Sequence, residues 1–310
     1  MDESTILSGA SPQAEAVLDL FTIVMIVAGV VFLIVAGLVI TNIIRYRRSK
    51  VSGTPRQNPG NAKLETLWTI GPALTLGFVF FLAVRAMNLT EPPPRQHPTN
   101  LIITANQWWW KGEYLPDSIV VANEFHWPVD SLWLLRILSA DVDHDFWVPS
   151  LGPKVDAIPN HPNHIWMQPI DTGLYQGMCA EFCGAEHAWM RFSIIVEPHS
   201  KYNAWLKHQA QDAPFPTDSL EVSGFRTFVS MTCRNCHTIR GTGSNGIVGP
   251  DLTHVASRRK LAGGVMDNTP QNMATWLHDP QKIKPGCHMP NLDLTNSQVH
   301  ALVAYLETLQ

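Results

Sequence analysis

The sequence predicts a multidomain protein: a transmembrane α-helical hairpin, then an all-β domain, then an all-α C-terminal domain. Three observations support this organisation. Two long stretches without charged residues, 20–44 and 66–84, lie near the N-terminus. Short apolar runs separated by Pro, Gly, Asn and Asp follow them, which is typical of a β domain. The last third of the chain carries a Cys-x-x-Cys-His motif and an amphipathic closing segment, 297–309.

The charged fraction, the net charge and the cysteine pattern favour a membrane protein over a nucleic-acid-binding or a disulfide-rich one. The chain has 310 residues, of which only 15% are charged, a low share that indicates membrane segments. Its formal net charge is −4, so we expect no nucleic-acid partner. Four of the five cysteines form two closely spaced pairs, and one is left over. A disulfide framework is therefore not expected.

The first 95 residues are predicted to be a membrane anchor, with transmembrane helices at about 18–44 and 65–88 and a linker. Each helix is long enough to cross a hydrocarbon core of ~30 Å. The connection between them is basic: Arg45, Arg47, Arg48, Lys50, Arg56 and Lys63. No Lys or Arg precedes it, so the positive-inside rule places this loop in the cytoplasm and both chain ends outside.

Two other interpretations of the hairpin are a cleaved signal peptide and a buried pair of soluble helices. The first apolar stretch is too long for a signal peptide, and its leader is acidic rather than basic. The basic flanks argue against a buried pair. We therefore expect a retained hairpin in a lipid bilayer, followed by a stiff, extended linker at 91–95, Glu-Pro-Pro-Pro-Arg.

The β domain is predicted to span 96–200. Its candidate strands are Leu101–Ala105, Ser118–Ala122, Ser131–Leu138, His164–Ile170 and Arg191–Val196. Short strands with turn residues between them indicate a sandwich or barrel. A polar, helix-like segment, 200–212, and a Pro-rich hinge then lead into the C-terminal domain, so that 201–310 comprises a linker helix and the last domain.

Residues 179–190 read C-A-E-F-C-G-A-E-H-A-W-M and place two thiols, an imidazole and a thioether close together. Soft sulfur with imidazole suits copper or zinc, and the thioether favours copper. Cys179 and Cys183 have a spacing at which each thiolate could bridge two copper ions. A disulfide or a zinc knuckle is the alternative. A second imidazole is needed, and His144 is the candidate upstream.

His144, with F-W-V-P-S-L-G-P-K shortly after it, and the 179–190 motif together resemble the binuclear copper (CuA) domain of cytochrome c oxidase subunit II. The resemblance implies a cupredoxin-like fold. It also implies two copper ions, bound by His144, Cys179, Glu181 (backbone carbonyl), Cys183, His187 and Met190. Two carboxylates, Asp143 and Asp145, flank His144 where the family has an aliphatic residue and Ser. If they point inward, we expect them to lower the copper potential.

The same family resemblance assigns three further roles. Its Q-W-x-W motif matches at Gln107, so Trp108 would be an exposed aromatic residue through which electrons enter, against a packing role. Glu181 would also reach a Mg or Mn ion shared with subunit I. The pattern E-x-x-W-T-I-x-P, from Glu65 to Pro72, resembles the second helix of the family, which packs against subunit I.

The C-terminal domain carries C-R-N-C-H at 233–237, the signature of c-type haem attachment. Cys233 and Cys236 would form the thioethers, and His237 would be the axial ligand. A thioredoxin-like motif or a zinc half-site is the alternative. Met289, 52 residues after His237, resembles the sixth ligand of a class I cytochrome c, with His288 as a rival.

That resemblance to class I cytochromes c extends to nearby residues. It implies that a backbone carbonyl near Pro250 holds His237, and that Trp276 meets a haem propionate. Cys287 is interpreted as a small buried residue, with a reactive or cross-linking thiol as the alternative. The additional histidines His126, His161 and His164 are interpreted as surface or hydrogen-bonding residues rather than ligands, because the copper set is already complete.

Together the two resemblances cover the chain and imply subunit II of a bacterial caa-type cytochrome c oxidase with a fused cytochrome c. Electrons would pass from a donor, cytochrome c or a quinol-oxidising complex, to the haem, then to the copper pair and to the haem of subunit I. Oxygen reduction and proton pumping would occur in that partner. The metal domains would lie on the periplasmic face of the inner membrane. Alternatives are the small subunit of a copper-relay nitric oxide reductase, or a membrane-tethered metal-binding or copper-delivery module.

Overall fold

A computed structural model of the chain describes residues 7–47, 53, 60–91 and 98–310. The predicted linker at 92–95 and the basic residues Arg48, Lys50 and Arg56 lie outside the described residues. The chain forms two compact units, one comprising Met1–Ala14 with Pro92–Gln310, the other Glu15–Glu91.

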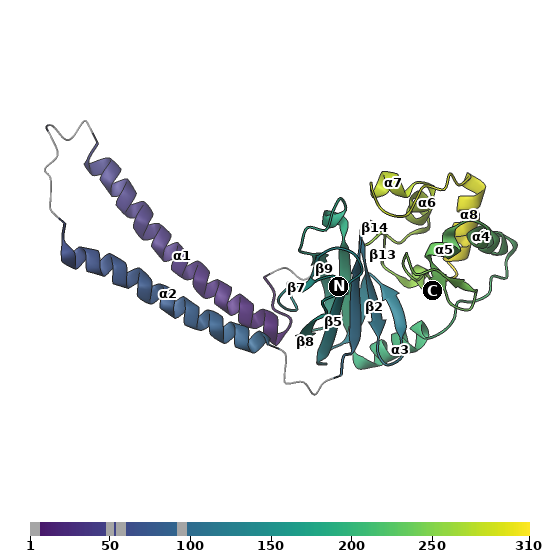
Figure 1. The fold of residues 1–310 in the computed structure, drawn as a ribbon, viewed down its shortest axis with the longest axis horizontal. Helices are drawn as coiled ribbons and strands as arrows, with labels where there is room; N and C mark the ends of the chain where they lie inside the picture. The colour runs from purple at the N-terminus through teal and green to yellow at the C-terminus, as the bar shows by residue number, and fades with distance from the viewer. Residues whose placement is uncertain (1–6, 48–52, 54–59, 92–97) are drawn as a thin grey trace. The chain divides into compact units, whose positions relative to one another are not determined.

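The smaller unit consists of two long helices, α1 (Pro12–Arg45) and α2 (Ala62–Thr90), drawn in purple and blue in Figure 1. Both are long and apolar enough to cross a membrane, and no residue of their most apolar windows is buried. They extend beyond the predicted 18–44 and 65–88 because polar turns continue each helix past its apolar core. Asn61 caps α2, its side chain accepting hydrogen bonds from the backbone N–H of Lys63 and Leu64.

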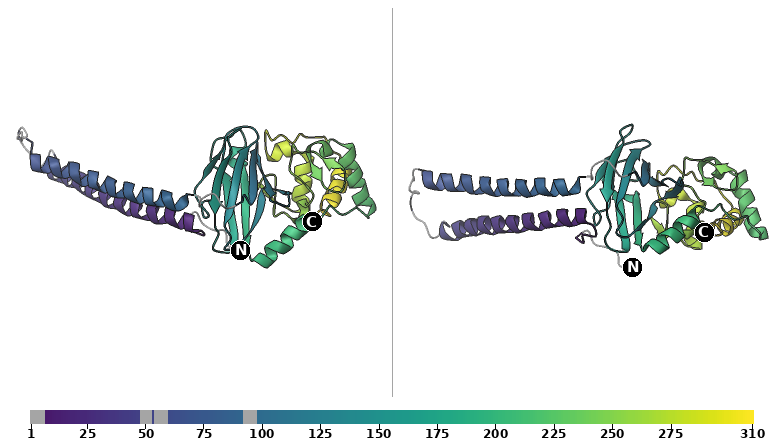
Figure 2. Two further views of the ribbon diagram at one scale, coloured as in Figure 1. Left: turned by 60° about the horizontal axis from the view of Figure 1, so that its bottom comes forward. Right: turned by 90° about the horizontal axis from the view of Figure 1, so that it is seen from below.

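Two five-stranded sheets form the β domain, as the teal strands of Figure 2 show. One has the order β3-β2-β1-β5-β8 and the other β4-β10-β9-β6-β7. The strands of the first sheet are β1 (Leu101–Asn106), β2 (Trp109–Tyr114), β3 (Ile119–Ala122), β5 (Trp133–Ser139) and β8 (Asn163–Met167). Those of the second are β4 (Glu124–Pro128), β6 (His144–Trp147), β7 (Val155–Ala157), β9 (Gly173–Cys179) and β10 (Arg191–Glu197).

The core lies between the two sheets. Its largest fully buried side chains include Trp110, Phe125, Trp127, Leu135 and Phe192. The five predicted strands correspond to β1, β3, β5, β8 and β10, and the predicted sandwich is confirmed. The other five strands were not predicted, because aromatic, polar and metal-binding residues interrupt their apolar alternation.

The N-terminal segment before α1 attaches to the β domain, which the sequence does not predict. The backbone N–H of Ala10 donates to the carbonyl of Ser150 at 2.8 Å, and the N–H of Ile170 donates to Ala10 O at 2.9 Å. The buried Ser11 hydroxyl donates to Leu151 O at 2.7 Å. These bonds fix the residues that lead into α1.

The C-terminal domain is helical. Its helices are α3 (His199–Gln209), α4 (Ser219–Ser230), α5 (Cys233–Cys236), α6 (Pro270–His278), α7 (Pro280–Ile283) and α8 (Asn296–Leu306). Two short two-stranded ribbons accompany them: β11 (Thr238–Ile239) with β12 (Ser244–Asn245), and β13 (Lys260–Leu261) with β14 (Met266–Asp267). Helices α4 and α8 cross closely at Gly224, where an added Cβ would lie 2.0 Å from Ala301 O. In all the views this domain lies on one side of the sandwich (Figures 1 and 2).

Candidate metal sites and the contact between them

A cluster of sulfur and imidazole side chains lies at one end of the second sheet. Cys179 Sγ is 3.7 Å from Cys183 Sγ and 3.8 Å from His144 Nδ1. Cys183 Sγ is 3.6 Å from His187 Nδ1 and 3.8 Å from Met190 Sδ. The structure therefore brings together the two thiols, both imidazoles and the thioether that the sequence singled out. A disulfide S–S bond is about 2.05 Å long, so the two sulfurs are not bonded to each other.

Local structure explains this convergence. Strand β6 contributes His144, and the neighbouring β9 ends at Cys179. The chain then turns through Gly184, whose φ of +113° suits glycine, into a short 3₁₀ helix, His187–Trp189. The backbone carbonyl of Glu181 also faces the cluster, 3.2 Å from Cys179 Sγ. Two thiols, two imidazoles, a thioether and a carbonyl form a donor set that fits copper.

Asp141 holds the imidazole of His144. Its Oδ1 accepts a hydrogen bond from His144 Nε2 at 2.7 Å, which leaves Nδ1 facing Cys179. Its Oδ2 accepts from the backbone N–H of Gln107 at 2.6 Å. A carboxylate that orients a ligating histidine is a frequent partner in metal sites. Sequence reasoning missed this residue, although it lies only three positions before His144.

The two cysteine thiols lie in hydrogen-bond contact at 3.7 Å. The contact with Cys183, together with the neighbouring His144, outweighs burial and lowers the pKa of Cys179 to about 3. The same contact and burial raise the pKa of Cys183. Because metal ligation requires thiolates, binding of a metal ion at this site would release the thiol protons.

The indole of Trp108 lies against the backbone of the cluster. Its Nε1 donates to Cys183 O at 3.0 Å, and Gln107 Nε2 donates to the same oxygen at 2.8 Å. Trp108 is 9% exposed, whereas the family resemblance led us to expect an exposed aromatic residue. The next tryptophan but one, Trp110, is fully buried in the core and packs edge-on to His144.

The acidic residues near the cluster take different positions. Glu181 is exposed. Asp143 is exposed as well. Asp145 is buried, but its carboxylate lies 3.4 Å from Lys154 Nζ. It follows His144 in strand β6, so the two side chains point to opposite faces, and Asp145 does not enter the cluster.

The three additional histidines lie outside the cluster. His161 and His164 are exposed. His126 forms a hydrogen bond with Glu197 at 2.9 Å through Nδ1 and stacks on Trp205 of α3, with ring centroids 4.3 Å apart. This arrangement fits the predicted hydrogen-bonding role and ties the linker helix to the sheet.

The second candidate site is a cavity of about 220 Å³ in the C-terminal domain. Cys233, Cys236, His237 and Met289 all line it, as does Trp276, within a largely apolar wall. His237 Nδ1 donates to Pro250 O at 2.7 Å, leaving Nε2 available as a ligand. Burial lowers the pKa of His237, which keeps the imidazole neutral. Two thiols, a neutral imidazole and a thioether around an apolar cavity fit a c-type haem.

Close backbone approach is needed beside His237. A Cβ added at Gly249 would lie 2.6 Å from His237 Cε1, so glycine is required there. Gln281 fixes the loop that carries Met289. Its Nε2 donates to Cys287 O and Met289 O, each at 2.7 Å. Sequence reasoning did not identify Gln281. Cys287 is half-buried beside it, rather than buried as predicted.

The two sites meet at Trp108. The cavity that contains Met289 is also bordered by Gln107, Trp108 and Trp109 of the β domain. The exposed His288, which precedes Met289, lies against the Trp108 indole with ring centroids 5.2 Å apart. The C-terminal domain thus covers the aromatic residue that borders the sulfur cluster.

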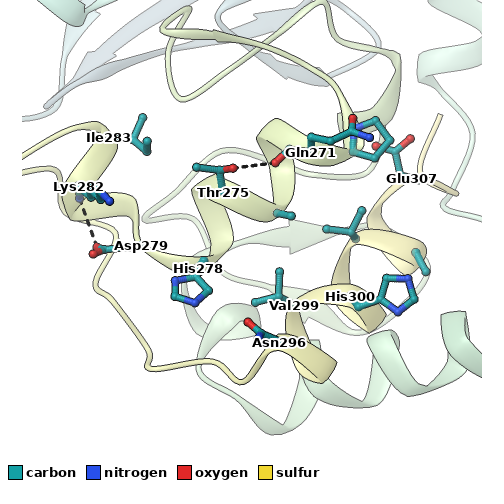
Figure 3. Close-up of a pocket in the computed structure, with 14 residues that line it drawn as sticks. Gln271, Thr275, His278, Asp279, Lys282, Ile283, Asn296, Val299, His300 and Glu307 are labelled. Atoms are coloured by element: carbon teal, nitrogen blue, oxygen red, sulfur yellow. Dashed lines mark hydrogen bonds between the residues drawn. The ribbon is translucent and has the colours of Figure 1, made fainter.

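A separate groove of about 810 Å³ lies between α6, α7 and α8 (Figure 3). Its polar groups bond mainly within their own helices: Thr275 Oγ1 donates to Gln271 O at 2.8 Å, and the N–H of Lys282 donates to Asp279 Oδ1 at 3.3 Å. Among the residues that the structure describes, none of the predicted ligands lines this groove. We therefore assign no metal to it.

Comparison with known proteins covers the whole chain. Residues 4–89 match the family "Cytochrome C oxidase subunit II, transmembrane domain", residues 115–198 its "periplasmic domain", and residues 222–310 the family "Cytochrome c". A protein named cytochrome c oxidase subunit 2 from Alkalihalophilus pseudofirmus is 32% identical over 99% of this chain and 91% of its own length. Proteins of the same name from Bacillus sp. PS3 and Bacillus subtilis are 30% and 29% identical, each over 86% of this chain and 80% and 81% of their own lengths.

Proposed function

We propose, from the premise that this chain belongs to the cytochrome c oxidase subunit II family, that it relays electrons from a bound haem to a copper site and on to its catalytic partner. Members of this family are electron-transfer subunits of a haem–copper oxidase, an oxidoreductase complex. This chain is a membrane protein with a periplasmic domain and a fused cytochrome c domain. Copper and haem would each accept and donate one electron at a time. The protein would provide their ligands and fix the distance between the two cofactors.

Within that role, we propose that two copper ions are held by His144, Cys179, Cys183, His187 and Met190 together with the carbonyl of Glu181. The convergence of these donors within 3.2–3.8 Å of a cysteine sulfur supports this assignment. The two sulfurs lie side by side, so each can be shared between two ions. A copper-delivery module is disfavoured because a site with this many ligands would not release its ion readily.

For the haem, we propose thioether bonds to Cys233 and Cys236, with His237 and Met289 as axial ligands. The hydrogen bond from His237 Nδ1 to Pro250 O orients the imidazole. Gln281 holds the Met289 loop in place. His and Met ligation raises the haem potential, which suits a donor to copper.

Trp108 is proposed as the residue through which electrons reach the copper site. Its ring contacts His288 of the haem-binding domain on one side and donates to the carbonyl of Cys183 on the other. This buried position supports transfer within one chain rather than from an external protein docked directly on Trp108. The external donor, a cytochrome c or a quinol-oxidising complex, would deliver its electron to the haem domain.

The remaining assignments concern the assembly. The partner is proposed to be oxidase subunit I, whose haem receives the electron and where oxygen is reduced to water with proton pumping. The exposed carboxylate of Glu181 is proposed to complete a Mg or Mn site with that partner. We place the protein in a bacterial inner membrane, with domains at 1–95, 96–200 and 201–310. Both termini and the metal-binding domains would be on the periplasmic side.

The test is copper electron paramagnetic resonance on the full chain, matured with haem and copper. We expect the hyperfine pattern of one electron shared equally by two copper nuclei, and its loss in Cys183→Ser. Ser223→Ala, on an exposed position of α4, is the matched control and should keep the pattern. A mononuclear pattern in the wild type, or no copper beside an intact haem, would contradict the two-copper assignment.

A further inference from the structure

Lys284 is a buried lysine in the loop that carries Met289. The residue is 3% exposed, although lysine is almost never fully buried unless it is paired. Its Nζ donates to Trp108 O at 2.9 Å and to Ala262 O at 3.4 Å. Burial lowers its pKa to about 8, which leaves the ammonium form predominant at neutral pH.

The two acceptors belong to different parts of the fold. Ala262 lies in the haem-binding domain, just after β13 (Lys260–Leu261), whereas Trp108 lies between β1 and β2 of the sandwich. Lys284 and Trp108 are 176 residues apart in sequence. The lysine side chain therefore joins the Met289 loop to the backbone of the residue whose indole touches Cys183.

A glycine and a buried carboxylate lie around the Lys284 ammonium group. A Cβ at Gly263 would lie 3.1 Å from Lys284 Nζ and 3.3 Å from Trp108 O, and Gly263 has a φ of +74°. Glycine thus leaves the space that the lysine occupies. Glu186, in the copper-binding loop, is also 3% exposed, and its Oε2 has no hydrogen-bond partner among the described residues. Its carboxylate favours the charged form of Lys284.

We propose that Lys284 is a positioning residue that fixes the Met289 loop on the Trp108 backbone and so sets the distance between the two metal sites. The expected effect on electron transfer rests on the proposed function. The contact between the two domains does not, because it depends only on these side chains. Because electron transfer slows steeply with distance, loosening this contact should slow the step between the sites.

Two backbone amides report whether the domains are docked. The N–H of Arg191, at the start of β10, donates to Gly263 O at 3.2 Å. The N–H of Arg259 donates to Glu124 Oε2 at 3.1 Å. Both bonds join the haem-binding domain to the sandwich, so both amides should exchange with solvent faster when the domains separate.

The experiment is hydrogen–deuterium exchange on the full chain in its assembled oxidase, comparing wild type with Lys284→Met. We expect the Arg191 and Arg259 amides to exchange about tenfold faster in the variant, which corresponds to about 1.4 kcal/mol of docking free energy. Lys282→Met, an exposed lysine two residues away, is the matched control and should leave both amides unchanged. Lys284→Arg, which keeps a charged donor, should restore most of the protection.

Unchanged exchange in Lys284→Met would overturn the proposal. If that variant fails to assemble, Lys284→Gln replaces it: faster exchange supports the proposal, and wild-type exchange overturns it. A second measurement distinguishes the docking role of Lys284 from the proposed electron relay: the haem is photoreduced, and electron transfer to copper is followed by the copper absorbance. Slower transfer in Lys284→Met supports the positioning role. If the wild type transfers no electron to copper while its amides stay protected, the proposed relay fails and the docking role stands.

Discussion

The indole Nε1 of Trp108 donates a hydrogen bond to the carbonyl oxygen of Cys183 at 3.0 Å, so one hydrogen bond joins this aromatic residue to a cysteine of the proposed copper site. Gln107 donates to the same oxygen at 2.8 Å. This carbonyl is held from two directions by adjacent residues. The geometry of the Cys183 backbone therefore depends on the short segment that precedes β2.

Trp108→Phe and Gln107→Met should each destabilise the folded protein by about 1 kcal/mol, since each removes one hydrogen bond. The double variant should lose more than the sum, because the buried carbonyl then has no donor. Thermal unfolding of the wild type, the two single variants and the double variant measures these losses of stability. Trp109→Phe is the control, since its indole is not among the described donors to Cys183. Strict additivity would show that the two bonds act independently.

Asp141→Asn should weaken copper binding about 10–100-fold, the usual cost of removing a carboxylate partner from a ligating histidine. Asp141 fixes the imidazole of His144 at 2.7 Å, and an amide offers no negative charge to that ring. Competition with a copper chelator measures the affinity. Asp143→Asn, exposed and two residues further on, should bind copper as the wild type does. Equal affinities for the two variants would contradict the role given to Asp141.

His126 should make the stability of the β domain depend on pH. Burial alone would lower its pKa, but hydrogen bonds with Glu124 and Glu197 outweigh this, and the pKa is raised. Because the pKa of His126 is higher in the folded state, its protonated form stabilises the folded protein. This contribution is fully present below the unfolded-state pKa of about 6.5, and it is lost as the pH rises through the folded-state pKa.

His126→Phe tests this, because the aromatic ring can still stack on Trp205 but cannot titrate. The difference in unfolding free energy between wild type and variant should shrink as the pH is raised from about 5.5 to about 8. His161→Phe, at an exposed position, provides the comparison. A difference that does not change with pH would show that the Glu124 and Glu197 contacts are not charge pairs.

Gly224→Ala should destabilise the haem-binding domain by about 1–3 kcal/mol, the range for overpacking a closely packed core. The new methyl group would lie 2.0 Å from Ala301 O, and the backbone of α8 cannot yield without moving the helix. Ser223→Ala, exposed on the same helix, should change stability little. Denaturant unfolding followed through the haem absorbance distinguishes them. A stable Gly224→Ala protein would mean that α4 and α8 can separate at little cost.

The sequence was sufficient where the chemistry is local. Cys179, Cys183, His187 and Met190 lie within twelve residues, so their spacing alone indicates a shared site. His144 is 35 residues before Cys179, so its spacing alone does not place it in the site, and the pairing of β6 with β9 brings the two together. Strands whose alternation is broken by such residues, including β6 and β9, were not predicted.

Contacts that depend on tertiary approach could not be predicted. Lys284 appears in sequence as one more lysine in a polar loop, and only the docking of two domains buries it. The family resemblance implies an exposed Trp108, with a packing role as the alternative. In this chain the attached cytochrome c domain covers the residue. Gln281 and Asp141 act through hydrogen bonds that no motif encodes.

The anchoring of the N-terminal segment has a consequence for biosynthesis. Ser11 bonds to Leu151, a partner 140 residues later, and Ala10 bonds to Ile170. Ribosomes release the chain from its N-terminus, so these partners do not exist when the first apolar stretch emerges. Ala10 and Ser11 can form these hydrogen bonds only after most of the β domain has been synthesised. The attachment of this segment to the β domain is therefore a late step in folding.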